Sequence, residues 1–288
     1  MQRIRLRYTK RGRLRFTSHR DFQRAFERAL RRAEVPMAYS AGFTPHPKVS
    51  YANAAPTGTG SEAEYLEIAL TEARDPDKLR DLLDESMPVG LDIIEAVEAR
   101  TSGLADRLTA SVWELRLDGV DPAEAERAVE AFKAADAVEV QRKTKNGMRT
   151  FDARAAVASL EASSGSSTAA SSEASSEASS ETSSETNSPQ ADRSSDQACA
   201  ILRLVVRHVT PAVRPDDVLS GLRAVADLAP PVAAAVTRLA QGLFDEETGT
   251  VTDPLAPDRE AVMAVPPSHE EAVAASAAAK APVPEGPA

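Results

Sequence analysis

The chain has 288 residues, and 34 Lys and Arg against 44 Asp and Glu give it a formal net charge of −10 at pH 7. This sum conceals an asymmetry, because residues 1–50 carry 13 Lys and Arg against 3 Asp and Glu. A polyanion is therefore expected to bind, if anywhere, to the N-terminal part of the chain. The single cysteine, Cys199, excludes an internal disulfide, and no Cys/His cluster has zinc-like spacing.

The sequence gives no sign of a membrane attachment. No apolar run approaches the ~18 residues that a membrane-spanning helix needs. The N-terminus is basic but lacks the apolar stretch of a signal peptide. We therefore expect a cytoplasmic protein with no membrane partner and no metal site.

The first hundred residues combine strand and helix patterns. Apolar and basic residues alternate over 4–8, which predicts a half-buried strand. Ser18, with Asp21 three residues later, predicts the start of a helix that runs to about residue 33. The apolar residues of this helix recur at i, i+3, i+4 and i+7, and arginines occupy the rest of its surface.

Three more strands and a second helix complete the N-terminal part. The strands are predicted at 35–40, 65–70 and 91–97, and Asp75-Pro76 is a typical helix start. The order strand, helix, strand, strand, helix, strand is the split βαβ or ferredoxin-like pattern. Residues 1–100 are thus predicted to form a basic ferredoxin-like domain.

A weaker copy of this pattern follows over residues 108–228. It comprises a strand at 113–117, a helix opened by Asp121-Pro122, a hairpin around 145–147, a strand at 200–206 and a helix from Pro215. Fifteen of the residues 161–195 are Ser, and such a segment has little apolar surface to offset the entropy of ordering. The overall expectation is an α+β protein of two ferredoxin-like units in tandem, with disorder at 161–196 and in a tail at 253–288.

Arginine dominates the candidate binding residues. Its planar guanidinium grips phosphate oxygens through several donors at once. The predicted phosphate-binding side chains are Arg11, Arg13, Arg15, Arg20, Arg24, Arg28, Arg31, Arg32 and Lys48. Two other interpretations stay open, since an arginine-rich helix surface can be simply solvated, and it can instead pair with an acidic protein surface.

A second group of candidates surrounds the sequence Pro45-His46-Pro47. Two prolines hold His46 in a stiff loop, where a histidine can act as an acid or base near neutral pH or can merely shape a turn. A pocket is predicted from Ser40, Phe43, His46 and Tyr51. No second carboxylate or thiol stands at a telling spacing, so the residue spacing alone does not support catalysis, and His46 is kept as a candidate.

The stretches 14–22, 28–33 and 39–48 resemble a known bacterial family of unknown function, the radical SAM-linked or radical SAM-associated proteins. Ser61-Glu-Ala-Glu-Tyr65 adds to this resemblance, which covers about residues 1–228 apart from the Ser-rich segment. Ser40 to Pro45 is also similar to the RAMP-type endoribonucleases that process CRISPR repeats, as an analogy at the level of the fold.

The family resemblance implies a radical SAM protein as partner. The iron–sulfur cluster of such an enzyme is held by three cysteines, and this chain has one. The cluster and S-adenosylmethionine are therefore expected only in the partner, and no cofactor is expected in this chain.

Three functions follow from these observations. The first is a non-catalytic module that binds RNA, such as tRNA or rRNA, and presents it to a radical SAM enzyme. The second is an RNA-cleaving or RNA-modifying enzyme that uses His46 as acid and base. The third is a protein–protein adaptor that docks on a radical SAM partner.

Overall fold

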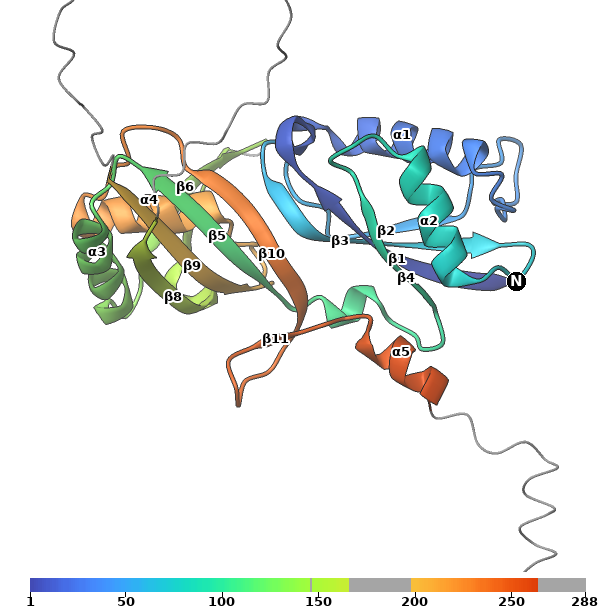
Figure 1. Cartoon of the computed structure of the whole chain (residues 1–288). Coiled ribbons are helices and arrows are strands. Elements are labelled where there is room, and N and C mark those ends of the chain that lie inside the picture. Colours follow the sequence, from blue (N-terminus) through green and yellow to red (C-terminus); the bar gives the residue numbers. More distant parts are fainter. Residues whose placement is uncertain (146, 166–197, 264–288) are drawn as a thin grey trace, which may run out of the picture.

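A nine-stranded sheet runs through the whole molecule (Figure 1). The computed structural model describes residues 1–145, 147–165 and 198–263. The path of the sheet is β4-β1-β3-β10-β5-β9-β8, with β2 added beside β3 and β11 beside β10. The strands are β1 (Gln2–Lys10), β2 (Val49–Ala52), β3 (Gly60–Leu70), β4 (Ile93–Glu98), β5 (Ala110–Asp118), β8 (Val157–Ser164), β9 (Cys199–Arg207), β10 (Ala235–Phe244) and β11 (Val251–Thr252).

The two halves of this sheet repeat one strand order. In the N-terminal half the order is β4-β1-β3-β2, and in the C-terminal half it is β10-β5-β9-β8. Each half thus places its first strand between its fourth and its third. The halves join where β10 pairs in parallel with β3, at Thr237 opposite Gly60 and Arg238 opposite Ser61. The mixed α/β class is confirmed, whereas the assignment of the halves as ferredoxin-like units stays a prediction.

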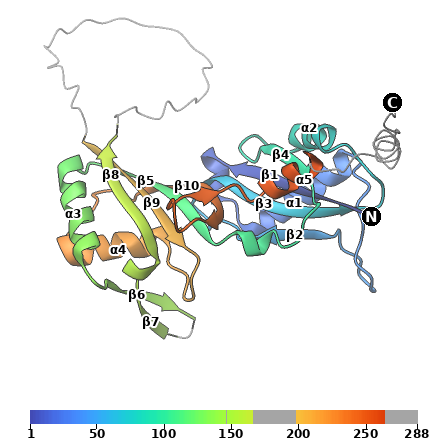
Figure 2. The ribbon, with the colours of Figure 1, turned by 90° about the horizontal axis from the view of Figure 1, so that it is seen from below.

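Each half has its own helices (Figures 1 and 2). Each half also has its own apolar core. The helices are α1 (His19–Arg32), α2 (Pro76–Ser86), α3 (Pro122–Ala134), α4 (Pro215–Ala226) and α5 (Ala256–Met263). α1 and α2 pack on β1, β3 and β4, where Phe26, Leu66 and Leu83 are fully buried. α3 and α4 pack on the C-terminal half around Phe132 and Leu222. Two separate cores explain how one continuous sheet accommodates two helical layers.

Local sequence signals set most helix starts. Ser18 accepts a hydrogen bond from the backbone N–H of Asp21, which confirms the predicted cap of α1. Asp75 and Asp121 cap α2 and α3 in the same way, and each is followed by a proline at the first helical position. The predicted hairpin is β6 (Glu139–Thr144) with β7 (Gly147–Asp152), which projects from the C-terminal half in Figure 2.

Residues after Arg11 form a short 3₁₀ helix, η1 (Gly12–Phe16). Two expectations about the elements were wrong. The predicted strand 35–40 contributes only isolated bridges, because the ladder partner of β3 on that side is β2. The second unit was predicted to end at residue 228, but the chain beyond it supplies β10. This strand was missed because its polar residues interrupt the alternation of apolar and polar residues that marks a strand.

The predicted disordered segments also need correction at their edges. β8 extends to Ser164 and pairs with β9, so the first residues of the predicted insertion are a strand. Residues 253–263 are ordered and include α5, which lies against β4. The rest of the two segments, 166–197 and 264–288, lies outside the described residues.

Candidate nucleic-acid interface

η1 and α1 form a cationic surface along the edge of the N-terminal half. Phe22, Phe26, Ala29 and Leu30 of α1 are buried against the sheet. The arginines at positions 20, 24, 28 and 31 follow the i, i+4 and i, i+3 spacing on the opposite side, and all are exposed. η1 directly precedes α1 in the chain and buries none of its residues, so Arg13 and Arg15 are also exposed.

Most of these guanidinium groups are available to a ligand. We define the arginine face as the six exposed side chains on η1 and α1, namely Arg13, Arg15, Arg20, Arg24, Arg28 and Arg31. Among the described residues, Arg24 is the one member of this set that forms an ion pair. Its Nη1 lies 3.7 Å from Oδ1 of Asp21. Because that pair is exposed, it contributes little to holding the arginine in place.

Two predicted arginines instead have structural partners. Arg11 donates to both carboxylate oxygens of Glu62, one of them at 2.8 Å, and also lies 3.6 Å from Asp92. The Glu62 hydrogen bond raises the pKa of Arg11. Arg32 donates to the backbone oxygen of Ser86 at 3.1 Å and so ties α1 to α2. Sequence reasoning could not separate these two from the others, because their partners lie more than fifty residues away.

An exposed aromatic ring lies next to the arginine face. Phe16 is 58% exposed, and the guanidinium carbon of Arg15 lies 4.6 Å from the centre of its ring. The backbone oxygen of Arg15 accepts a hydrogen bond of 2.8 Å from the N–H of Gly58, which holds η1 against the loop between β2 and β3. An exposed aromatic ring with a stacked guanidinium is a typical platform for an unpaired base.

The Pro-His-Pro loop does not share the site with η1. Ser40 and His46 close the loop with two hydrogen bonds, from the His46 N–H to Ser40 Oγ at 3.0 Å and from the Ser40 N–H to the His46 oxygen at 2.9 Å. Phe43 at its tip is fully exposed. The loop lies beyond the C-terminal end of α1, whereas η1 lies at its start (Figure 1).

Of the four residues of the predicted pocket, Ser40, Phe43 and His46 belong to this loop, and Tyr51 lies apart from it. Tyr51 packs on α1, with its ring 4.8 Å from that of His19 and 6.1 Å from that of Phe22. Burial raises the pKa of Tyr51. The His46 imidazole has no hydrogen-bond or ion-pair partner among the described residues, and Lys48 is exposed nearby. Nothing among the described residues orients His46 for proton transfer.

A cavity of about 440 Å³ lies where the two halves of the sheet meet. Asn53 and Pro56 come from the loop after β2, Trp113 from β5, His208 from the end of β9, and Arg238 from β10. Arg214, which precedes α4, completes the polar lining. The sequence did not single out these residues, since they lie up to 185 positions apart. We refer to this site as the junction cavity.

A buried polar network forms the wall behind the junction cavity. Arg238, 2% exposed, makes an ion pair with Glu64, 1% exposed, and its guanidinium carbon lies 5.3 Å from the Trp113 ring centre. Gln241 links the halves, because its Oε1 accepts from Asn53 at 3.0 Å and its Nε2 donates to the Ala63 oxygen at 2.6 Å. These partners fix the wall in one arrangement.

His208 serves to hold the junction cavity together. Its Nδ1 lies 2.6 Å from the Leu108 oxygen, which only an N–H can satisfy, so Nε2 accepts from the Ser111 hydroxyl at 2.8 Å. Burial lowers the pKa of His208, the Leu108 carbonyl opposes this, and the charge of Arg238 adds to it. A neutral imidazole with both nitrogens occupied is a structural group and a poor proton carrier.

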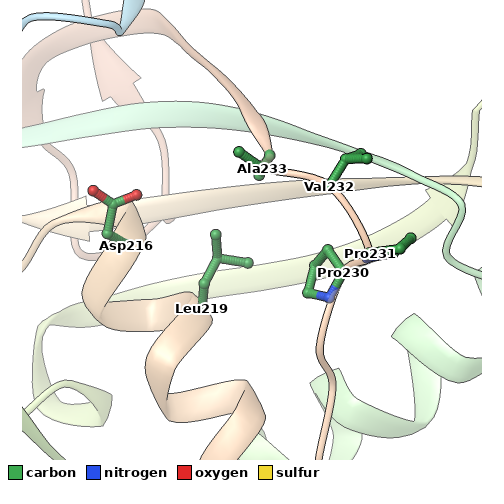
Figure 3. Close-up of a pocket in the computed structure, with 7 residues that line it drawn as sticks. Asp216, Leu219, Pro230, Pro231, Val232 and Ala233 are labelled. Atoms are coloured by element: carbon green, nitrogen blue, oxygen red, sulfur yellow. The ribbon is translucent and has the colours of Figure 1, made fainter.

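A further hollow, of about 380 Å³, lies beside α4 (Figure 3). Leu219 and the Asp216 carboxylate stand on one side, and Pro230, Pro231 and Val232 on the other. Its apolar walls and its one negative charge do not suit a polyanion.

No helix among residues 1–145, 147–165 and 198–263 is long and apolar enough to cross a membrane. The same residues include no group of three or more His, Cys, Asp or Glu side chains placed to hold a metal ion.

The fold and the site define a protein of mixed helices and mostly antiparallel strands, with an exposed cationic helix and a cavity between the two halves of its sheet. Residues 3–215 match the family described as uncharacterized proteins conserved in bacteria (DUF2344), and the chain belongs to this family. This confirms the expected bacterial domain of unknown function, whereas the link to radical SAM enzymes is still a proposal. No curated protein matches the chain.

Proposed function

We propose that this protein is a non-catalytic RNA-binding module that presents its RNA to a radical SAM enzyme. The observation that carries the RNA-binding part is the arginine face, six exposed guanidinium groups with a single weak acidic contact among the described residues. The net charge of −10 makes the location of this positive surface more significant, because the rest of the chain repels nucleic acid.

Single-stranded RNA suits this surface better than a duplex. The arginines in a row along α1 can contact successive phosphates of one RNA strand. The exposed ring of Phe16 can stack on an unpaired base of that strand. Duplex RNA buries its bases, so the exposed ring would have no partner in it. Accordingly, we propose that the module binds an unpaired stretch of tRNA or rRNA.

The radical SAM partner is proposed from the sequence resemblance alone. Under this proposal the partner holds the iron–sulfur cluster and S-adenosylmethionine, and this chain holds neither. Two ferredoxin-like units would then act as the platform on which the RNA lies. The repeated strand order of the two halves supports this interpretation of the fold.

A pair of charge-matched variants tests the RNA-binding function. Arg20→Gln/Arg28→Gln removes two charges from the arginine face, and Arg127→Gln/Arg223→Gln removes two exposed helical arginines from α3 and α4. Both variants have the same net charge. Filter binding with a single-stranded oligoribonucleotide at low salt is expected to show a loss of affinity of about tenfold or more for the first variant only, as expected for lost phosphate contacts. Equal losses in both variants, or no retention of RNA by the natural protein, would overturn the proposal.

A second experiment addresses the partner. The chain is purified from its native cell with and without nuclease treatment, and the proteins that accompany it are identified. A radical SAM protein that is lost on nuclease treatment supports RNA presentation. A radical SAM protein that survives the treatment, with no RNA present, would favour the adaptor function.

A further inference from the structure

We infer that the junction cavity binds one nucleotide, with its base held in the cavity and its phosphate on Arg214. The nucleotide is a unit of the RNA bound on the arginine face, so this part of the inference rests on the proposed function. The one-nucleotide site itself depends on different residues and can be tested alone.

The size and lining of the cavity fit a base. Its volume of about 440 Å³ is within the range of small-ligand sites, roughly 300–1,000 Å³. Trp113 and several aliphatic side chains, among them Leu108, Val206 and Val213, supply apolar walls. A flat aromatic ligand with a polar edge is favoured by walls of this kind.

Asn53 supplies a group that can recognise the base edge. Its Nδ2 is directed to Gln241, and its Oδ1 accepts no hydrogen bond from the described residues. An amide oxygen fixed in this way can accept from an exocyclic amino group or a ring N–H. Asn53 also has φ of 45°, a left-handed conformation that is uncommon outside glycine and is found more often at binding sites.

The charges around the junction cavity favour an anion. No carboxylate belongs to its lining, whereas Arg214 and Arg238 both do. Arg238 is neutralised by Glu64, but Arg214 forms no ion pair within the described residues. Asp217 accepts from the backbone N–H of Arg214 at 2.7 Å, and its carboxylate is paired with Arg142 at 2.6 Å. Arg214 is therefore the group available for a phosphate.

The loop between β2 and β3 connects this cavity with the arginine face. Ala54 and Pro56 line the cavity, and Gly58, a few residues on, bonds to Arg15 of η1. Lys10 also donates to the Pro56 oxygen at 3.0 Å, which holds the loop on β1. A strand of RNA that follows α1 towards η1 thus reaches the cavity after crossing one short loop.

Trp113 makes the test direct, because it is the only tryptophan of the chain. The full-length protein is titrated with each of the four ribonucleoside monophosphates, with the matching nucleosides and with inorganic phosphate, while Trp113 emission is recorded. Calorimetry of the same mixtures serves as a second measurement. At least one monophosphate is expected to give a saturable change, the nucleoside a weaker one, and phosphate alone almost none.

Substitutions in the lining of the junction cavity test whether the nucleotide binds there. Arg214→Gln is expected to weaken monophosphate binding by about tenfold and to leave nucleoside binding unchanged, as for one lost charge-assisted contact. Asn53→Gly keeps the left-handed backbone, removes the amide and is expected to weaken both ligands. Arg127→Gln, the control, should change neither. No saturable signal with any monophosphate, or the same affinity in Arg214→Gln, would overturn the inference.

The two proposals fail separately. Arg20→Gln/Arg28→Gln should reduce RNA affinity and leave monophosphate binding intact. RNA binding without monophosphate binding would remove the junction site and keep the arginine face. Monophosphate binding without RNA binding would keep the nucleotide site and overturn the proposed function.

Discussion

Arg5 and Asp258 form an ion pair between the first strand of the protein and its last described helix. Arg5 is 1% exposed and Asp258 is 0% exposed, although 253 residues separate them. Asp258 also accepts hydrogen bonds from the backbone N–H groups of Arg100 and Thr101, at 3.0 and 2.9 Å. Arg107 also donates from Nη1 to Oδ2 of Asp258 at 3.1 Å. α5 is therefore fixed to the N-terminal half by a carboxylate whose oxygens are fully used.

Asp258→Asn should destabilise the protein strongly. The amide carries no charge to offset that of Arg5, which keeps only its ion pair with Glu67 at 2.9 Å among the described residues. One of the two polar atoms of the amide is a donor placed among donors. Removing one partner of a buried pair costs about 3–5 kcal/mol, and the remaining Glu67 pair places this loss at the lower end. Chemical denaturation should show this loss as a lower midpoint with an unchanged slope. Glu260→Gln, an exposed position on the same helix, is the control and should stay within about 0.5 kcal/mol. A small effect of Asp258→Asn would mean that α5 does not depend on this pair.

Stability should fall on acidification in a way that depends on Asp258. Burial alone would raise the pKa of this carboxyl, but hydrogen bonds from Thr101 and the Arg5 guanidinium outweigh it and lower the pKa below its ordinary value. The folded state therefore binds this proton less readily than the unfolded state does. The stabilisation is complete above the unfolded pKa of about 3.9 and is lost as the pH falls through the lower folded value.

The measurement is the free energy of unfolding between about pH 6 and pH 3. The natural protein should lose stability below about pH 4 more steeply than Asp258→Asn, which lacks the titrating group. Parallel curves for the two proteins would contradict the assignment.

The local parts of the fold were predictable from the sequence, and the non-local parts were not. Ser18, Asp75 and Asp121 cap their helices through contacts within three residues, so a short window of sequence holds the whole signal. Arg238 and Gln241, in contrast, are polar residues that break the alternation of β10, and they are buried because Glu64 and Ala63 meet them from 170 or more positions away. α5 was mistaken for part of the tail because its anchor, Arg5, is at the other end of the chain.

The candidate site was likewise predictable in its local parts and not in its non-local parts. The arginines of α1 were found because one helical period places them on one side. The position of Tyr51 apart from Ser40, Phe43 and His46 was not foreseen, because proximity in sequence was taken for proximity in space. The junction cavity was missed entirely, since five segments of the chain contribute to it.

Glu64→Gln should destabilise the junction between the two halves. Glu64 neutralises Arg238 and accepts from the N–H of Ala55 at 2.9 Å, and the amide can replace only the second role. The loss should be about 3–5 kcal/mol, because a buried guanidinium is left unpaired. Glu114→Gln is the matched control, since Glu114 pairs with Arg203, which is 65% exposed, and should cost at most about 1 kcal/mol. Thermal unfolding of both variants decides the question, and equal melting temperatures would contradict the role of Glu64.

RNA affinity should fall linearly with the logarithm of salt concentration, with a slope set by the number of phosphates contacted. For single strands each phosphate contributes about 0.7 to the slope, so six contacting arginines predict a slope of about −4. Arg20→Gln/Arg28→Gln should lower its magnitude by about 1.4, whereas Arg127→Gln/Arg223→Gln should leave it unchanged. Arg11→Gln should also leave the slope nearly unchanged, because Glu62 and Asp92 already neutralise that guanidinium. A slope that responds to Arg11 but not to Arg20 and Arg28 would place the RNA on β1 and η1 and away from the arginines of α1.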